Sequence, residues 1–204
     1  TKKELTELVP TIKTFEAVQD AFLESLRWRK PQDIGKSALE YINTIDMHSA
    51  YCHDQILETL LTVAAKPDHP FNAKFLHENL RRQNLADRDA NWSLFLHRQY
   101  KSKSSVDRLI DWACSTSDKS YVTDDALTLL AIPITWFLSS SNRFLRDRST
   151  KALVLLLEGR LPVLGTLLKE FSDVNDPYVS ERLFAVAYGS SLRSTDREGI
   201  QKLA

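Results

Sequence analysis

Two stretches of the chain decide its fold: Leu145-Arg146-Asp147-Arg148-Ser149-Thr150-Lys151-Ala152-Leu153-Val154-Leu155-Leu156 and Val179-Ser180-Glu181-Arg182-Leu183-Phe184-Ala185-Val186-Ala187. They present the same helical face twice, 34 residues apart. In both, small residues stand among large aliphatic ones, which lets neighbouring helices approach closely. An internal repeat at this period predicts stacked helix pairs, an elongated α-solenoid of the kind that usually holds other molecules.

The composition also favours an all-α chain. Only 5 Gly and 7 Pro occur among the 204 residues, and 43% of the residues are hydrophobic, which is ample for the core of one or two domains. The 27 basic and 27 acidic side chains balance. This balance argues against a large electrostatic footprint for nucleic acid or anionic lipid, although it leaves room for a local basic patch.

The cysteines and the apolar runs indicate the cellular compartment of the protein. Cys52 and Cys114 lie far apart and form no Cys-x-x-Cys pair, which favours reduced thiols in a cytoplasmic compartment. The longest strongly apolar run, residues 126–138, is too short to cross a bilayer, so no membrane partner is expected. The chain begins at Thr1 without a signal peptide, and we expect it to be a fragment of a larger polypeptide.

Apolar residues at helical spacing predict about ten helices and no strands. The expected helices cover residues 11–30, 34–46, 50–65, 71–83, 86–100, 106–114, 122–138, 143–158, 161–171 and 176–192, with one more from Thr195. Pro10 and Pro31 bracket the first of them, and Pro133 should kink or split the helix over residues 122–138. Asn142 and Asp176 are expected N-cap residues, and Gly159 is an expected helix end.

The segment Lys66-Pro67-Asp68-His69-Pro70 is the clearest interruption in the helical pattern. Two prolines within it disfavour helix on both sides. The segment is either a linker between subdomains or a long turn between helices. We take it as the boundary between an N-terminal helical subdomain, residues 1–66, and a helical-repeat region, residues 70–204.

The first repeated stretch resembles the second helix of a HEAT repeat. That helix carries an aliphatic–Arg pair, a small residue and then Ala-Leu, which here are Leu145-Arg146, Ser149 and Ala152-Leu153. The resemblance implies an all-α fold of stacked antiparallel helix pairs, a HEAT/ARM-like α-solenoid. The arginine of such repeats often ties neighbouring turns together through an acidic partner. Asp147 points elsewhere on the helix, so the partner is expected in the next repeat.

A second resemblance covers about residues 122–192. Residues 135–147 and 175–189 are similar to a helical segment of very large bacterial proteins that carry a STAND-type NTPase module. Some proteins of that kind are antiviral sensors that recognise phage proteins. Residues 1–120 do not contribute to the resemblance. No NTPase motif lies in this chain, so the resemblance implies a partner-binding segment and carries over no ATPase activity.

The sequence contains no complete motif for nucleotide binding, metal binding or catalysis. Gly35-Lys36-Ser37 ends like a phosphate-binding loop, but the required upstream glycine is replaced by Lys30 and no strand precedes it. His48, Cys52 and His53 supply too few zinc ligands without help from elsewhere, so a polar helix shoulder is favoured. We expect no cofactor, no metal and no catalytic residues. An enzyme that uses His53 or His77 between helices is the least favoured alternative.

The candidate interaction surface consists of arginines interleaved with aromatic residues. Its members are Arg81, Arg82, Arg88, Trp92, Arg143, Arg146 and Arg148. Acidic neighbours dilute each patch, and tryptophans are more often core or interface anchors than platforms for bases. We therefore expect a non-catalytic interaction or scaffold module that binds a protein or neighbouring domains. The alternative is a HEAT-like domain that holds nucleic acid on an Arg/Lys-lined surface.

Overall fold

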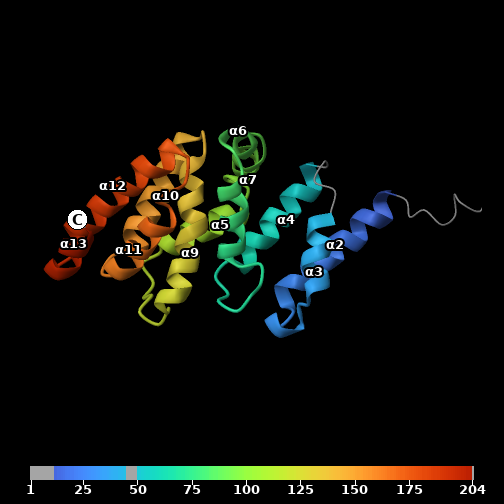
Figure 1. Ribbon diagram of the computed structural model, residues 1–204, viewed down its shortest axis with the longest axis horizontal. Coiled ribbons are helices and arrows are strands. Elements are labelled where there is room, and N and C mark those ends of the chain that lie inside the picture. The colour runs from blue at the N-terminus through green and yellow to red at the C-terminus, as the bar shows by residue number, and fades with distance from the viewer. Residues whose placement is uncertain (1–11, 45–49, 204) are drawn as a thin grey trace, which may run out of the picture. The chain divides into compact units, whose positions relative to one another are not determined.

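The structure is a computed structural model that describes residues 12–44 and 50–203 (Figure 1). Throughout these ranges the regular secondary structure is helical, and no strand occurs in them. This confirms the all-α prediction. The expectations for Pro10, for His48 and for the end of the helix predicted over residues 34–46 lie outside the described residues. Within the described part, no helix is both long and apolar enough to cross a membrane.

The chain divides into two compact units, Thr1–Thr59 and Leu60–Ala204. The first unit contains α2 (Ile12–Trp28), a 3-10 turn (Pro31–Asp33), α3 (Lys36–Thr44) and most of α4 (Ala50–Val63). The second contains the end of α4 and α5 (Ala73–Arg82), α6 (Leu85–Arg88), α7 (Leu94–Gln99), α8 (Ser105–Cys114), α9 (Asp124–Trp136), α10 (Arg143–Leu156), α11 (Leu161–Glu170), α12 (Pro177–Arg193) and α13 (Arg197–Leu203). The segment 66–70 lies inside the second unit, as a turn in which His69 N–H donates to the carbonyl of Lys66.

Several helix ends fall where the sequence predicts them. Asn142 caps α10 by accepting from the N–H of Phe144, and Asp176 caps α12 by accepting from the N–H groups of Tyr178 and Val179. Pro177 occupies the first turn of α12, where its missing N–H costs little. Gly159 adopts a left-handed φ of 70° after the last turn of α10. Glycine takes this conformation at little cost.

One predicted helix is divided, and another continues past a proline. The helix predicted over residues 86–100 consists of α6, a π-helical turn (Asp89–Ser93) and α7. The helix expected to kink or split at Pro133 does not split, since α9 continues three residues beyond Pro133 and passes into a 3-10 turn (Phe137–Ser139). Tertiary burial explains this continuation, because every residue from Leu129 to Ser139 is buried.

Helix α9 forms the centre of the second unit. It packs against α5, α10 and α11, which lie around it (Figure 1). Its low amphipathicity follows from this position, because a helix surrounded by others is apolar on all sides. The repeated stretches lie in the neighbouring helices α10 and α12.

Helices α10 and α12 pack against each other in a constant register. Arg182 donates to Asp147 at 2.7 Å, and Arg193 donates to Glu158 at 3.0 Å, each pair being 35 residues apart in sequence. Between these two links, a Cβ on Gly189 would lie 3.0 Å from Cγ2 of Val154. A constant offset means that the two helices run parallel. On the other side of α10, Arg148 reaches back to Asp111 of α8.

Candidate functional site

The structure separates the predicted surface residues into two groups. Arg82 and Arg143 are exposed, with side chains 78% and 80% accessible. Arg88 and Trp92, in contrast, are only 2% and 1% accessible. These two residues are therefore part of the interior, and the expectation that they contribute to an exposed interaction surface is corrected here.

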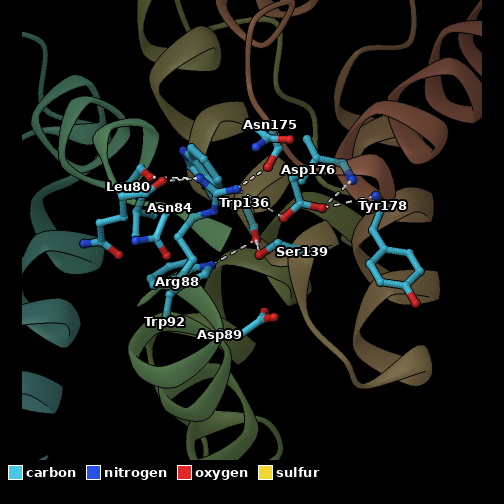
Figure 2. A network of polar contacts seen from close by, with 12 residues as sticks. Leu80, Asn84, Arg88, Asp89, Trp92, Trp136, Ser139, Asn175, Asp176 and Tyr178 are labelled. Atoms are coloured by element: carbon cyan, nitrogen blue, oxygen red, sulfur yellow. Dashed lines mark hydrogen bonds and ion pairs between the residues drawn. The ribbon is translucent and has the colours of Figure 1, made fainter. Parts of the chain in front are cut away.

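Arg88 is buried because the surrounding backbone supplies hydrogen-bond acceptors. Its Nη1 donates to the carbonyls of Gln83 at 2.7 Å and Leu80 at 3.4 Å, and its Nη2 donates to the carbonyl of Asn175. Asp176 Oδ2 lies 4.0 Å from Nη2. Figure 2 shows the side chain extending from α6 toward the loop that carries Asn175 and Asp176. Arg88 thus joins the end of α5 to the start of α12.

Two tryptophans frame this arginine. The Arg88 guanidinium carbon lies 5.5 Å from the Trp136 ring centroid, within cation–π range. Trp92 Nε1 donates to the carbonyl of Trp136 at 3.1 Å, which is the last carbonyl of α9 (Figure 2). The Ser139 hydroxyl donates to the same carbonyl at 2.8 Å, so the indole and the hydroxyl together satisfy this helix-end acceptor. The side chains of this network thus link the backbones of separate helices, and its charged groups point into the interior.

His77 belongs to the same interior. Its Nδ1 accepts a hydrogen bond from Trp136 Nε1 at 3.1 Å, and its ring contacts Phe171 edge-on, with centroids 4.6 Å apart. Burial lowers the pKa of His77 below its ordinary value of 6.5, against the opposing influence of Glu170 and Glu78. A neutral, packed histidine that accepts from an indole fits a structural role better than general acid–base catalysis.

Asp176 is the carboxylate of the network. Burial raises the pKa of Asp176, while the N–H groups of Val179 and Tyr178 and the charge of Arg88 oppose that shift. The same carboxylate caps α12 through those two N–H groups. Its Oδ1 thus accepts from the helix start and its Oδ2 lies within ion-pair distance of Arg88, which explains Asp176 as a structural group.

The exposed arginines of the predicted surface are neutralised locally. Arg81 lies 3.1 Å from Asp173, and Arg82 lies 3.7 Å from Glu78. Arg143 pairs with Asp147 at 3.5 Å. Arg148 pairs with Asp111 and lies 3.9 Å from Asp107. Each of these guanidinium groups thus has a carboxylate beside it, and no uncompensated row of cations is formed by the four.

Arg146 turns toward the next helix without an acidic partner among the described residues. Its Nη1 donates to the carbonyl of Ser140 at 2.5 Å, and its guanidinium lies 4.7 Å from the Tyr178 ring centroid. The acid–arginine link that we expected for Arg146 is formed instead by its neighbour Asp147, with Arg182 of the following copy.

The remaining candidates that the structure describes lie in ordinary polar contacts. Cys52 Sγ contacts Gln19 Oε1 at 3.4 Å, and His53 lies 3.9 Å from Asp54. Within residues 12–44 and 50–203, no three His, Cys, Asp or Glu side chains gather to hold a metal ion. An open depression of about 460 Å³ lies between α5, α9 and α11, with Lys74, Asp125 and Glu170 on its walls. Its shallow, mixed lining defines no ligand.

The surface feature that the sequence reasoning missed is an apolar stripe on α12. Phe184, Tyr188 and Leu192 are 73%, 69% and 69% exposed and stand four residues apart on one face of the helix. The signal was visible as an i, i+4, i+8 pattern of large apolar residues. The repeat predicts only which residues face the core, and these lie on the opposite side of α12, where Val179, Leu183 and Val186 are buried.

No family model, curated protein or solved structure matches the chain. We therefore infer the function from the geometry of this molecule.

Proposed function

We propose that the chain is a non-catalytic helical-repeat interaction module of HEAT/ARM-like, α-solenoid type that binds a protein partner. The observation that carries the proposal is the arginine–acid relay across α8, α10 and α12. Arg148 reaches back to α8 and Arg182 reaches back to α10, and these two arginines are 34 residues apart. Stacked repeats are expected to place equivalent residues, here the two arginines, against the preceding helix of the stack.

Binding of a protein is favoured over binding of a nucleic acid. Phosphate recognition needs cations that are free to replace counterions. Arg81, Arg82, Arg143 and Arg148 all stand beside carboxylates. The exposed apolar residues on α12 instead provide the type of surface that marks a protein contact on a soluble domain. The larger bacterial STAND-type context remains a prediction of the sequence resemblance.

Affinity capture tests the proposal directly. The chain, immobilised through its C-terminus, is incubated with cell extract before and after digestion with nuclease. We expect a protein to be retained at a defined stoichiometry in both cases. Retention that disappears after nuclease treatment would favour the nucleic-acid alternative instead. So would saturable binding of a duplex oligonucleotide that weakens by about 10³-fold or more between low and physiological salt.

A further inference from the structure

The face of α12 that carries Phe184, Tyr188 and Leu192 is equivalent to the face of α10 that receives α12. The contacts with α12 are made by Asp147 and Val154 of α10 and by Glu158 in the turn that follows α10. Adding the repeat length of 34 to these positions gives Glu181, Tyr188 and Leu192. Phe184 lies between them on the same side of the helix. We define these four residues of α12 as the outer stripe.

The outer stripe continues an interface that is already used inside the molecule. On α10 the corresponding face presents the acid Asp147, which receives an arginine. About two turns later it presents the aliphatic Val154, which receives a glycine. The outer stripe again begins with an acid, Glu181, which forms no ion pair with any described residue. Tyr188 then takes the place of Val154, whereas Leu192 takes the place of the acid Glu158. Phe184, Tyr188 and Leu192 are more than two-thirds exposed.

We infer that the outer stripe is the docking site for an amphipathic helix of a partner protein. The helix lies parallel to α12, places an arginine on Glu181 and places a small residue seven positions later over Tyr188. The inference rests on the proposed function, because it specifies the partner of the interaction module. The required helix has the pattern that α12 itself shows toward α10, with Arg182 followed seven residues later by Gly189.

A second copy of the chain does not fit this description. Its own Arg182 and Gly189 are held against α10 and are unavailable to another molecule. The charge at Glu181 and the continuity with the α10–α12 interface therefore favour a helix supplied by a partner.

The test uses a fluorescent, helix-stabilised peptide with the sequence of residues 176–193, titrated into the intact chain by fluorescence anisotropy. We expect saturable binding. Glu181→Lys should weaken binding about tenfold or more, because it places like charges together. A peptide carrying Arg182→Glu should bind the unmodified chain weakly and regain affinity for the Glu181→Lys chain. This exchange of charges distinguishes binding at the outer stripe from a peptide that displaces α12 and binds α10 in its place, because binding to α10 does not involve Glu181.

Phe184→Ala tests the apolar part of the stripe, and Tyr121→Ala is the matched control. Tyr121 is equally exposed, at 73%, but lies in the loop before α9. We expect Phe184→Ala to weaken peptide binding about tenfold or more and Tyr121→Ala to leave it unchanged. Circular dichroism of each variant verifies that the helices remain intact.

Three results would overturn the inference. One is the absence of saturable binding by a peptide shown to be helical. Another is binding that Glu181→Lys leaves unchanged. The third is a dimer in analytical ultracentrifugation that Phe184→Ala dissociates, because the occupant would then be a second copy. Failure here is distinct from failure of the proposed function: if Phe184→Ala still captures protein from nuclease-treated extract, only the outer stripe is discarded.

Discussion

The guanidinium of Arg88 exchanges its water shell for main-chain carbonyls of Leu80, Gln83 and Asn175. A charge buried in this way is tolerated because the acceptors are fixed by helix ends and by the start of α12. The nearby Asp176 supplies the opposite charge. Removing either member leaves the other without its partner in the interior, and this asymmetry makes the pair sensitive to mutation.

We predict that Arg88→Met lowers the free energy of unfolding by about 3–5 kcal/mol, because it leaves a buried carboxylate and open carbonyls behind. Arg88→Met combined with Asp176→Asn should recover part of the loss, since Asn still caps a helix. Urea denaturation followed by circular dichroism measures both. Arg82→Met, with a side chain 78% exposed, is the control and should change stability by less than about 0.5 kcal/mol. Equal losses in the two arginine variants would contradict the buried network.

The burial of His77 predicts that the free energy of unfolding depends on pH. Burial lowers the pKa of His77 in the folded state, whereas the unfolded chain titrates near the ordinary value of 6.5. Below that value the unfolded state takes up protons that the native state rejects, so the free energy of unfolding falls as the pH decreases. Protonation would also place an N–H on Nδ1, against the donor of Trp136.

The expected result is that unfolding free energy decreases less between about pH 7 and pH 5 in His77→Phe than in the unmodified chain. Urea titrations at the two pH values measure the difference. The absolute stability of His77→Phe at neutral pH is not the criterion, because the variant also loses the hydrogen bond to Trp136. Identical decreases in the two proteins would show that His77 does not contribute.

Sequence reasoning at the residue scale works for helix ends and fails for Arg88 and Trp92. A cap is local: Asp176 and Pro177 determine the start of α12 through atoms only a few residues away. The burial of Arg88 depends on the Asn175 carbonyl, 87 residues distant. No local pattern contains that information, and arginine is usually exposed. The site was therefore predictable only in its exposed members.

At the scale of the elements, the repeat length anticipates the contact register of α10 and α12. The pattern repeats every 34 residues, and the contacts are offset by 35. The sequence pattern left open whether the helix kinks or splits at Pro133, because the effect of a proline is judged locally, whereas α9 is held together by burial along its C-terminal half. The π-helical turn before α7 is likewise invisible to helical periodicity.

Gly189 tests the closeness of the α10–α12 contact. A Cβ at this position would lie 3.0 Å from Cγ2 of Val154, a stiff β-branched side chain in α10. We predict that Gly189→Val destabilises the chain by about 1–3 kcal/mol through overpacking, and that Val154→Ala in the same chain recovers much of the loss.

The matched control for this test is Gly165→Ala in α11, where the nearest atom is the flexible tip of Leu203 at 3.4 Å. Helix propensity should make this variant neutral or more stable by up to about 1 kcal/mol. Thermal melts and urea titrations compare the variants. A Gly189→Val chain as stable as the original would mean that α12 lies further from α10 than described.

The small residues of the repeat differ in burial, and this changes what is expected of them. Ala152 is fully buried at 0% exposure, whereas Ala187 is half-buried. We predict that Ala152→Arg unfolds or swells the second unit because it buries an unpaired charge, and that Ala187→Arg is much milder because its guanidinium can reach water. Size-exclusion chromatography and near-ultraviolet circular dichroism distinguish the two outcomes. A stable, compact Ala152→Arg chain would contradict the packing of α10.

At the scale of the whole molecule, the question is where the second unit begins. The prolines of residues 66–70 predict a boundary there, whereas the contacts divide the chain after Thr59, within α4. The end of α4 explains the difference. Leu61, Val63 and Ala64 are 2%, 0% and 0% exposed, and the Ala64 carbonyl accepts from the N–H of Ala73 beyond the proline turn. A turn rich in proline thus joins two packed segments.

Two fragments test these boundaries against each other. Residues 50–204 keep α4 whole, whereas residues 71–204 lose Leu61, Val63 and Ala64 from the core. Since each fully buried aliphatic side chain contributes about 1.5–3 kcal/mol, we predict that the shorter fragment is several kcal/mol less stable than the longer one. Urea unfolding, followed by the near-ultraviolet signal of the buried Trp92 and Trp136, measures both. Equal midpoints would place the boundary at the prolines, because α4 would then add nothing to the core of the second unit.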